Sequence, residues 1–144
     1  DKQSPFLRSI IINKGSNNNI KKGMAVLNDS YLVGKIVEVN FATSRVLLLS
    51  DINSKIPISI EPGSLQSILS GDGDDMGIVQ YSKKNVPLKI DSIVYTSGAG
   101  GLFKSGIPIG KITKSVLNSK NNVEFFSDFS QLRFVNVALY EKKN

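Results

Sequence analysis

The chain has 144 residues, of which 40% are hydrophobic and 21% charged, a composition typical of one globular domain or two small ones rather than of a disordered protein. Its net charge of +6 comes mostly from lysines scattered in runs no longer than two, which favours a solvated surface over a nucleic-acid-binding stripe. Because it contains no cysteine and no histidine, the chain cannot build disulfides, thiol nucleophiles, a Ser-His-Asp triad or the usual zinc sites.

Short apolar runs bounded by Gly, Asn, Asp, Ser and Pro recur along the chain, a pattern typical of β-strands. No segment shows a sustained period of 3.6 residues, so we expect an all-β fold, a sandwich or barrel, with almost no helix. No stretch approaches 18 consecutive apolar residues, so we expect a soluble protein or part of an anchored one. In chain order, the predicted strands cover residues 7–12, 24–27, 32–39, 46–49, 56–60, 68–69, 77–81, 93–96, 107–114, 123–126 and 133–140.

Three segments occur twice in the same order, which indicates an internal duplication. Two of the three pairs are clear. Segments 31–39 and 107–115 are both centred on Gly-Lys-Ile, and segments 45–54 and 122–131 both contain Ser-Asp after two bulky apolar residues. The offset between copies grows from 68 residues to 76 and 77, so the second copy carries about eight extra residues near 96–110. The paired segments are 20–27 and 88–95, 31–39 and 107–115, and 45–54 and 122–131.

The duplication predicts two tandem small β-barrels. Each unit has about 70 residues and would bury little surface alone, so we expect the two to pack together as one body. We place the boundary where the strand alternation breaks off, with 1–63 as the first barrel and 64–144 as the second. The last strand could also cross back to complete the first unit. The glycine within each Gly-Lys-Ile copy, Gly34 and Gly110, fits a sharp bend or bulge of the kind that a small barrel needs to close.

The glycine-rich stretch 96–110 (TSGAGGLFKSGIPIG) lies where the second copy is longer than the first. A phosphate-binding loop or a dinucleotide fingerprint would lead into a helix, whereas Ile107 begins a predicted strand. A nucleophile elbow would need a base, and the chain has no histidine to supply one. We therefore interpret the stretch as an extended hairpin tip, on which Leu102 and Phe103 either fold back onto a barrel mouth or meet a partner.

Acidic residues occur in two further patterns. Asp72, Asp74 and Asp75 in SGDGDDMG resemble a calcium loop, but Lys83 stands where the final acidic ligand would be, so a hairpin turn is the better interpretation. Asp51 follows a bulky strand in the first copy and Asp128 follows one in the second. Because both copies have it, we predict that this aspartate caps the next turn by accepting backbone N–H bonds, which is a structural role.

From about Ser4 to Leu139 the sequence resembles the bacterial rod-shape-determining MreC family. The resemblance depends on the joint order and spacing of several short motifs. These are Ile12-Asn13-Lys14-Gly15 with Ile20 and Gly23-Met24, Leu32-Val33-Gly34 with Val37, and Thr96-Ser97-Gly98 with Phe103 and Gly106-Ile107-Pro108-Ile109-Gly110.

The resemblance implies a non-enzymatic scaffold of the cell-elongation machinery. Its β region would be two small barrels of chymotrypsin-like architecture without catalytic residues. It would lie on the periplasmic, extracytoplasmic face of the bacterial inner membrane, anchored by an N-terminal helix that this chain lacks. Implied partners are a second copy in dimers or larger arrays, MreD, the penicillin-binding transpeptidase of elongation and the MreB-organised assembly. The resemblance implies no cofactor, no metal and no nucleic acid.

We expect Tyr31, Leu102 and Phe103, on equivalent loops of the two units, to contact a partner or a second copy. On this reasoning, Phe103→Ala would weaken association and spare the fold. The alternative function is a nucleic-acid-binding β-barrel of the oligonucleotide-binding type, which would need aromatic residues on a basic face. However, Phe125, Phe126, Phe129 and Phe134 are predicted core residues. A hydrolase with a degenerate protease fold is a third hypothesis, disfavoured by the missing base.

Overall fold

The computed structural model describes residues 8–80, 88–114, 121–132 and 135–138. Within these ranges the fold is all-β, as predicted: eleven strands are joined by turns and three short 3₁₀-helices, with no α-helix. The strands form two sheets that lie side by side, and in both sheets every neighbouring pair is antiparallel. The 3₁₀-helices are η1 (Ser16–Asn18), η2 (Ala99–Gly101) and η3 (Phe129–Gln131).

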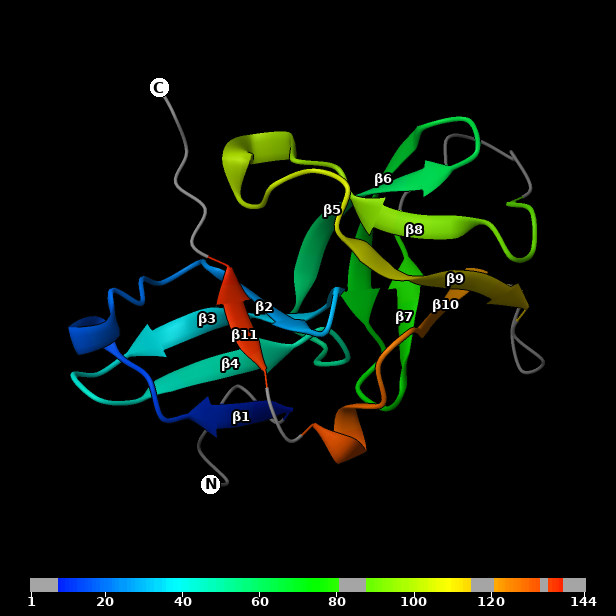
Figure 1. The fold of residues 1–144 in the computed structure, drawn as a ribbon. Coiled ribbons are helices and arrows are strands. Elements are labelled where there is room, and N and C mark those ends of the chain that lie inside the picture. Colours follow the sequence, from blue (N-terminus) through cyan, green and yellow to red (C-terminus); the bar gives the residue numbers. More distant parts are fainter. Residues whose placement is uncertain (1–7, 81–87, 115–120, 133–134, 139–144) are drawn as a thin grey trace.

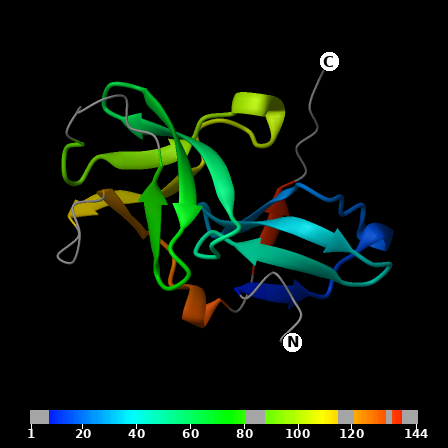
Figure 2. The same ribbon diagram turned by 180° about the vertical axis from the view of Figure 1, so that it is seen from behind.

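The first sheet has five strands in the order β1-β4-β3-β2-β11. It curls, so that β11 crosses in front of β3 and β4 in Figure 1 and behind them in Figure 2. The curl encloses a cluster of buried side chains that includes Val26, Val33 and Val46. The strands are β1 (Ser9–Ile12), β2 (Ala25–Asn28), β3 (Tyr31–Val39), β4 (Ser44–Leu48) and β11 (Asn136–Ala138).

The second sheet is a closed six-stranded barrel in the order β10-β7-β6-β5-β8-β9. Its interior is filled by branched side chains from facing strands, among them Ile58 and Ile112. Ala25, Leu32 and Leu49 of the first unit pack into the same cluster, so the two units share one core. The strands are β5 (Lys55–Glu61), β6 (Leu65–Gly71), β7 (Met76–Val79), β8 (Ile93–Thr96), β9 (Pro108–Lys114) and β10 (Asn121–Phe125).

The repeated segments of the sequence form strands that have equivalent neighbours in the two units. In the first unit β3 pairs with β2 on one side and β4 on the other, and in the barrel β9 pairs in the same way with β8 and β10. Each copy has a bulge at the residue before the shared glycine, at Val33 and at Ile109. A Cβ on Gly34 would collide with the backbone oxygen of Leu47, and one on Gly110 with that of Glu124. The glycines therefore allow a close approach between strands next to a bulge.

Of the predicted pair of barrels, the second is confirmed as a closed barrel, and the described part of the first unit is a curled five-stranded sheet. In the described part of the chain its edge strands β1 and β11 are not hydrogen-bonded to each other. The sequence left open whether the last strand returns to the first unit. It does, because β11 pairs with β2.

The change of sheet also does not coincide with the proposed 63/64 boundary. It falls between β4 and β5, because β5 pairs with β6 and β8 in the barrel. Residues 61–64 form the β5–β6 turn, where Glu61 accepts hydrogen bonds from the Ser64 amide at 3.0 Å and the Ser59 hydroxyl at 3.0 Å. The bond from Ser59, followed by that from the Ser64 amide, holds the pKa of Glu61 below its usual value.

Candidate interaction surface

The glycine-rich loop between β8 and β9 is held at its base by Thr96. Its hydroxyl donates to the carbonyl oxygen of Lys104 at 2.6 Å and accepts from the amide of Ile107 at 3.0 Å. Thr96 and Ile107 also pair through their backbones. Because Gly98, Gly100, Gly101 and Gly106 all have positive φ, the chain between these anchors follows a path that other residues rarely adopt. The extended hairpin tip predicted from the sequence is confirmed.

The two large apolar residues of the loop differ in burial. Leu102 is 47% exposed, whereas Phe103 is only 3% exposed and belongs to the core cluster shared by the two units. Phe103 thus folds back onto the barrel and supports the loop from beneath. The expectation that it is a surface contact whose loss spares the fold is at odds with this burial, and Leu102 remains as the exposed apolar side chain of the tip.

Tyr31 begins β3, immediately after the turn that is equivalent to the glycine-rich loop. Its ring is 37% exposed and lies 5.0 Å from the ring of Phe126, centroid to centroid, at an angle of 44°. Beside this pair, the side-chain amide of Asn28 donates to the hydroxyl of Ser127 at 3.3 Å. The aromatic pair therefore bridges the five-stranded sheet and the barrel.

Sequence reasoning missed Phe126 as a surface residue. The sequence did contain a signal: Phe125 and Phe126 are consecutive at the end of a strand, where successive side chains point to opposite faces, so only one of them can face the core. Phe125 packs against the core and contacts Phe129, with ring centroids 4.9 Å apart, while Phe126 faces outward.

A groove of about 620 Å³ separates the two equivalent loops. Asp29 and Ser30 line it from the β2–β3 turn, and Leu102 and Lys104 line it from the glycine-rich loop. Ala138, at the end of β11, lies along its floor with other apolar residues. The structure thus brings the two predicted loops to one groove, with Leu102 beside it and Phe103 beneath it.

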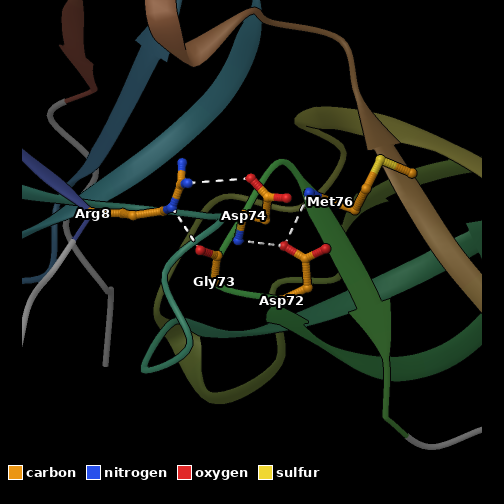
Figure 3. Close-up of polar contacts among 5 residues, drawn as sticks. All are labelled: Arg8, Asp72, Gly73, Asp74 and Met76. Atoms are coloured by element: carbon orange, nitrogen blue, oxygen red, sulfur yellow. Dashed lines mark hydrogen bonds and ion pairs between the residues drawn. The ribbon is translucent and has the colours of Figure 1, made fainter.

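A second, more polar cleft of about 910 Å³ lies where β1 meets the ends of the barrel strands. Here the Arg8 guanidinium donates through Nε to the carbonyl of Gly73 at 2.9 Å and through Nη2 to Asp74 Oδ1 at 3.4 Å (Figure 3). Asp72 Oδ1 accepts from the amides of Asp74 at 2.7 Å and Met76 at 3.1 Å. Asp72 therefore organises the β6–β7 turn, as predicted, and Gly73 and Asp74 join that turn to Arg8, the residue before β1.

The duplicated aspartates cap turns in both copies, as predicted. Asp51 accepts hydrogen bonds from the amide of Asn53 at 2.7 Å and from that of Arg8 at 2.8 Å. Asp128 accepts from the hydroxyl of Ser130 at 2.6 Å and its amide at 3.0 Å. The hydroxyl bond, followed by the amide bond, lowers the pKa of Asp128.

The described residues contain no group of three or more His, Cys, Asp or Glu side chains placed to hold a metal ion. Of the phenylalanines that a nucleic-acid surface would need, Phe125 and Phe129 pack against each other and Phe126 lies against Tyr31 with its ring tilted. Phe134 and the Lys83-Lys84 pair lie outside the described residues. Within the described ranges, no helix has the length and apolarity to cross a membrane.

Comparison with known proteins assigns the fold to one family. Residues 1–139 match the family described as rod shape-determining protein MreC, barrel core. The cell shape-determining protein MreC of Caulobacter vibrioides (strain NA1000 / CB15N) is 35% identical over 141 residues, which is 98% of this chain and 40% of that protein. The chain thus spans less than half the length of this curated relative.

Solved structures agree with the sequence match. The crystal structure of MreC from Pseudomonas aeruginosa superposes with a TM-score of 0.83 at 27% identity, covering 95% of this chain and 92% of that one. The fold is also shared with MreC in the complex between penicillin-binding protein PBP2 and MreC from Helicobacter pylori, with a TM-score of 0.70 at 17% identity over 95% and 88% of the two chains.

A further solved relative is the major periplasmic domain of the cell shape-determining filament MreC. It gives a TM-score of 0.71 at 20% identity over 84% of this chain and 80% of that one. The family match over nearly the whole sequence, the duplicated sheet and the shared core together show that this chain belongs to the MreC family, whose barrel core it forms.

Proposed function

We propose that this chain is a non-enzymatic scaffold domain on the extracytoplasmic side of a bacterial inner membrane, where it holds peptidoglycan-synthesis proteins in register. Family membership and the H. pylori complex of PBP2 with MreC support a penicillin-binding partner. The relative described as a filament supports self-association. Membrane anchorage, MreD and the MreB-organised assembly are further parts of the same proposal.

The observation that carries this proposal is the groove between the two equivalent loops. Exposed Leu102 lines one side of the groove. On the other side Tyr31, which lies against Phe126, directly follows the β2–β3 turn that lines it. The loops pack on a core shared by both units, so the surface is already in place before a partner binds. Pre-organised apolar residues beside a groove are typical of sites that bind other proteins.

The test is capture of the elongation transpeptidase from the same organism by the purified chain. Leu102→Asp and Tyr31→Ala are expected to reduce capture at least tenfold, which corresponds to about 1.4 kcal/mol. Phe41→Ala is the matched control, because Phe41 is 73% exposed in the distant β3–β4 turn. Equal capture by all three variants would contradict the assignment of this surface.

Sedimentation of the same variants tests self-association separately. If the groove also joins copies of the chain, Leu102→Asp shifts the protein toward the monomer and Phe41→Ala does not. Peptidase activity in the pure protein would contradict the non-enzymatic part of the proposal, whichever partner it binds.

A further inference from the structure

The turn between β3 and β4 carries the most exposed aromatic side chain of the described residues. Phe41 is 73% exposed, whereas Tyr31 and Phe126 are 37% and 36% exposed and lie against each other. Phe41 belongs to neither buried cluster of the described residues, and Ala42 beside it is also exposed. Single exposed apolar residues are common on protein surfaces, so the surroundings of Phe41 decide whether it has a role.

The loop around η1 holds this turn in place. The amide of Ser16 donates to the carbonyl of Asn40 at 2.9 Å. The amide of Asn17 donates to the carbonyl of Phe41 at 3.0 Å. Gly15 makes this approach possible, because a Cβ at that position would collide with the same two carbonyl oxygens. The backbone of the turn is therefore fixed, and the Phe41 ring projects into solvent from a rigid support.

Three exposed lysines lie around the turn. Lys21 and Lys22 line a hollow of about 590 Å³ that reaches the start of the turn at Asn40. Lys14 lies next to the end of the turn, where its carbonyl accepts from the hydroxyl of Ser44 at 2.7 Å. The η1 loop thus brings lysines from one part of the chain to an exposed aromatic ring from another.

The net charge of this end of the first unit is positive. Residues 13–24 and 37–45, which we call the basic end, contain three lysines, Arg45 and one carboxylate, Glu38, so the charges sum to +3. Glu38 Oε2 accepts from Arg45 Nε at 3.0 Å. The carboxylate therefore balances the arginine, and the sum that remains is the charge of the three lysines.

This composition fits a membrane surface better than a protein or a nucleic acid. Protein interfaces bury about 800 Å² per partner and are depleted of lysine at their centres, whereas here lysines and asparagines surround one ring. Single-stranded nucleic acid stacks on successive aromatic side chains, and the basic end has only Phe41. Protein surfaces that bind membranes place an aromatic ring among the lipid headgroups and lysines beside anionic ones.

We propose that the basic end docks on a membrane surface that contains anionic lipids, with the Phe41 ring inserted among the headgroups and Lys14, Lys21 and Lys22 around it. The η1 loop and the β3–β4 turn lie at the end of the first unit that is furthest from the barrel (Figure 1 and Figure 2). Docking there holds the barrel away from the bilayer. The surface is different from the groove beside Leu102, so this inference goes beyond the proposed scaffold function.

The chain has no tryptophan, so Phe41→Trp places a single fluorescent reporter in the turn. Vesicles of mixed phosphatidylglycerol and phosphatidylcholine are expected to shift its emission to shorter wavelengths, and lipids brominated near the headgroup are expected to quench it. Vesicles of phosphatidylcholine alone are expected to have a much smaller effect. Leu102→Trp is the matched control, because this residue is also exposed on a loop, and its emission is expected to stay unchanged.

Cosedimentation with the mixed vesicles measures the affinity. Phe41→Ala is expected to weaken binding about tenfold, and replacing Lys21 and Lys22 with glutamine is expected to weaken it about fivefold for each lysine. Replacing Lys55 and Lys89 with glutamine gives the same net charge and is the matched control, because both are exposed lysines outside the basic end. Binding is also expected to weaken as salt is added.

Unchanged emission of Phe41→Trp, equal quenching of Leu102→Trp, or equal binding by the two charge-matched double variants would overturn the proposal. Oligomers that Phe41→Ala dissociates would identify a second copy as the occupant. Binding of oligo-deoxythymidine that is lost in the same variants would identify a nucleic acid, and either result also overturns the proposal. Capture of the transpeptidase tests Leu102 and Tyr31 in the absence of vesicles, so the two proposals can fail separately.

Discussion

Replacing Phe103 with alanine tests whether the glycine-rich loop is supported by the shared core. The Phe103 ring is 3% exposed and packs with side chains from both units. A phenylalanine buries about 150–250 Å², which at about 25 cal/mol per Å² amounts to about 4–6 kcal/mol as an upper bound. Observed costs of Phe→Ala in cores are about 3–5 kcal/mol.

Because Phe103 also lines the groove of about 620 Å³, water can enter the space that the ring leaves, which reduces the cavity cost. We therefore expect a loss of about 3 kcal/mol, near the lower end of the range. The chain has no tryptophan, so urea unfolding is best followed by circular dichroism. With a slope of about 2 kcal/mol per M, the midpoint falls by about 1.5 M.

Leu102→Ala is the matched control, since the neighbouring side chain is 47% exposed. It should cost less than about 1 kcal/mol. A Phe103→Ala midpoint within 0.3 M (roughly 0.6 kcal/mol) of the wild type would refute the reasoning, because it would mean that the ring contributes little to the core.

Four other substitutions have defined outcomes, the last of them followed in a pH titration. Gly34→Ala and Gly110→Ala each push a Cβ into a backbone oxygen of the adjacent strand, so both should lower the unfolding free energy by at least about 1–3 kcal/mol, and a neutral result at either site would contradict the repeated close approach. Thr96→Val removes both hydroxyl bonds at the loop base and should cost about 2 kcal/mol, with faster amide exchange in the loop; unchanged exchange would argue against that anchor. Asp128 should titrate below its ordinary value of 3.8, so its contribution to stability is present above that pH and is lost as the pH falls through the lower folded value. Ser130→Ala should move the pKa of Asp128 upward in an NMR titration, and an unmoved pKa would disprove the hydroxyl as its main cause.

Much of the fold could be predicted because its signals are local. The Gly-Lys-Ile strands have the same neighbours in both units and the same bulge before the glycine, and the extra residues of the second copy fall in the β8–β9 loop. Strand β6 was predicted as two residues and has seven, from Leu65 to Gly71. Its Ser67 and Ser70 look like surface residues but are buried, and the Ser70 hydroxyl accepts from Gln80 Nε2 at 2.6 Å. A buried serine interrupts the alternation of apolar residues by which a strand is recognised in a sequence, so the length of β6 could not be predicted.

The errors concern long-range pairing. The turn at Glu61 and the turn after Asp51 are both polar interruptions between strands, and only the second marks the change of sheet. The pairing of β5 with β8 joins residues more than thirty positions apart, such as Ile58 and Thr96, and no local pattern records it. The different burial of Leu102 and Phe103 likewise depends on where the loop lies over the barrel, since adjacent apolar residues look equivalent in the sequence.

The order of the strands has a mechanical consequence. The first and last described strands, β1 and β11, are the two edges of one sheet, and the whole barrel is inserted between β4 and β11. Tension applied to the two ends of the described chain would therefore load the sheet first and leave the barrel out of the direct line of force. A protein bound at the barrel loop would therefore be carried along undistorted while the five-stranded sheet bears the load.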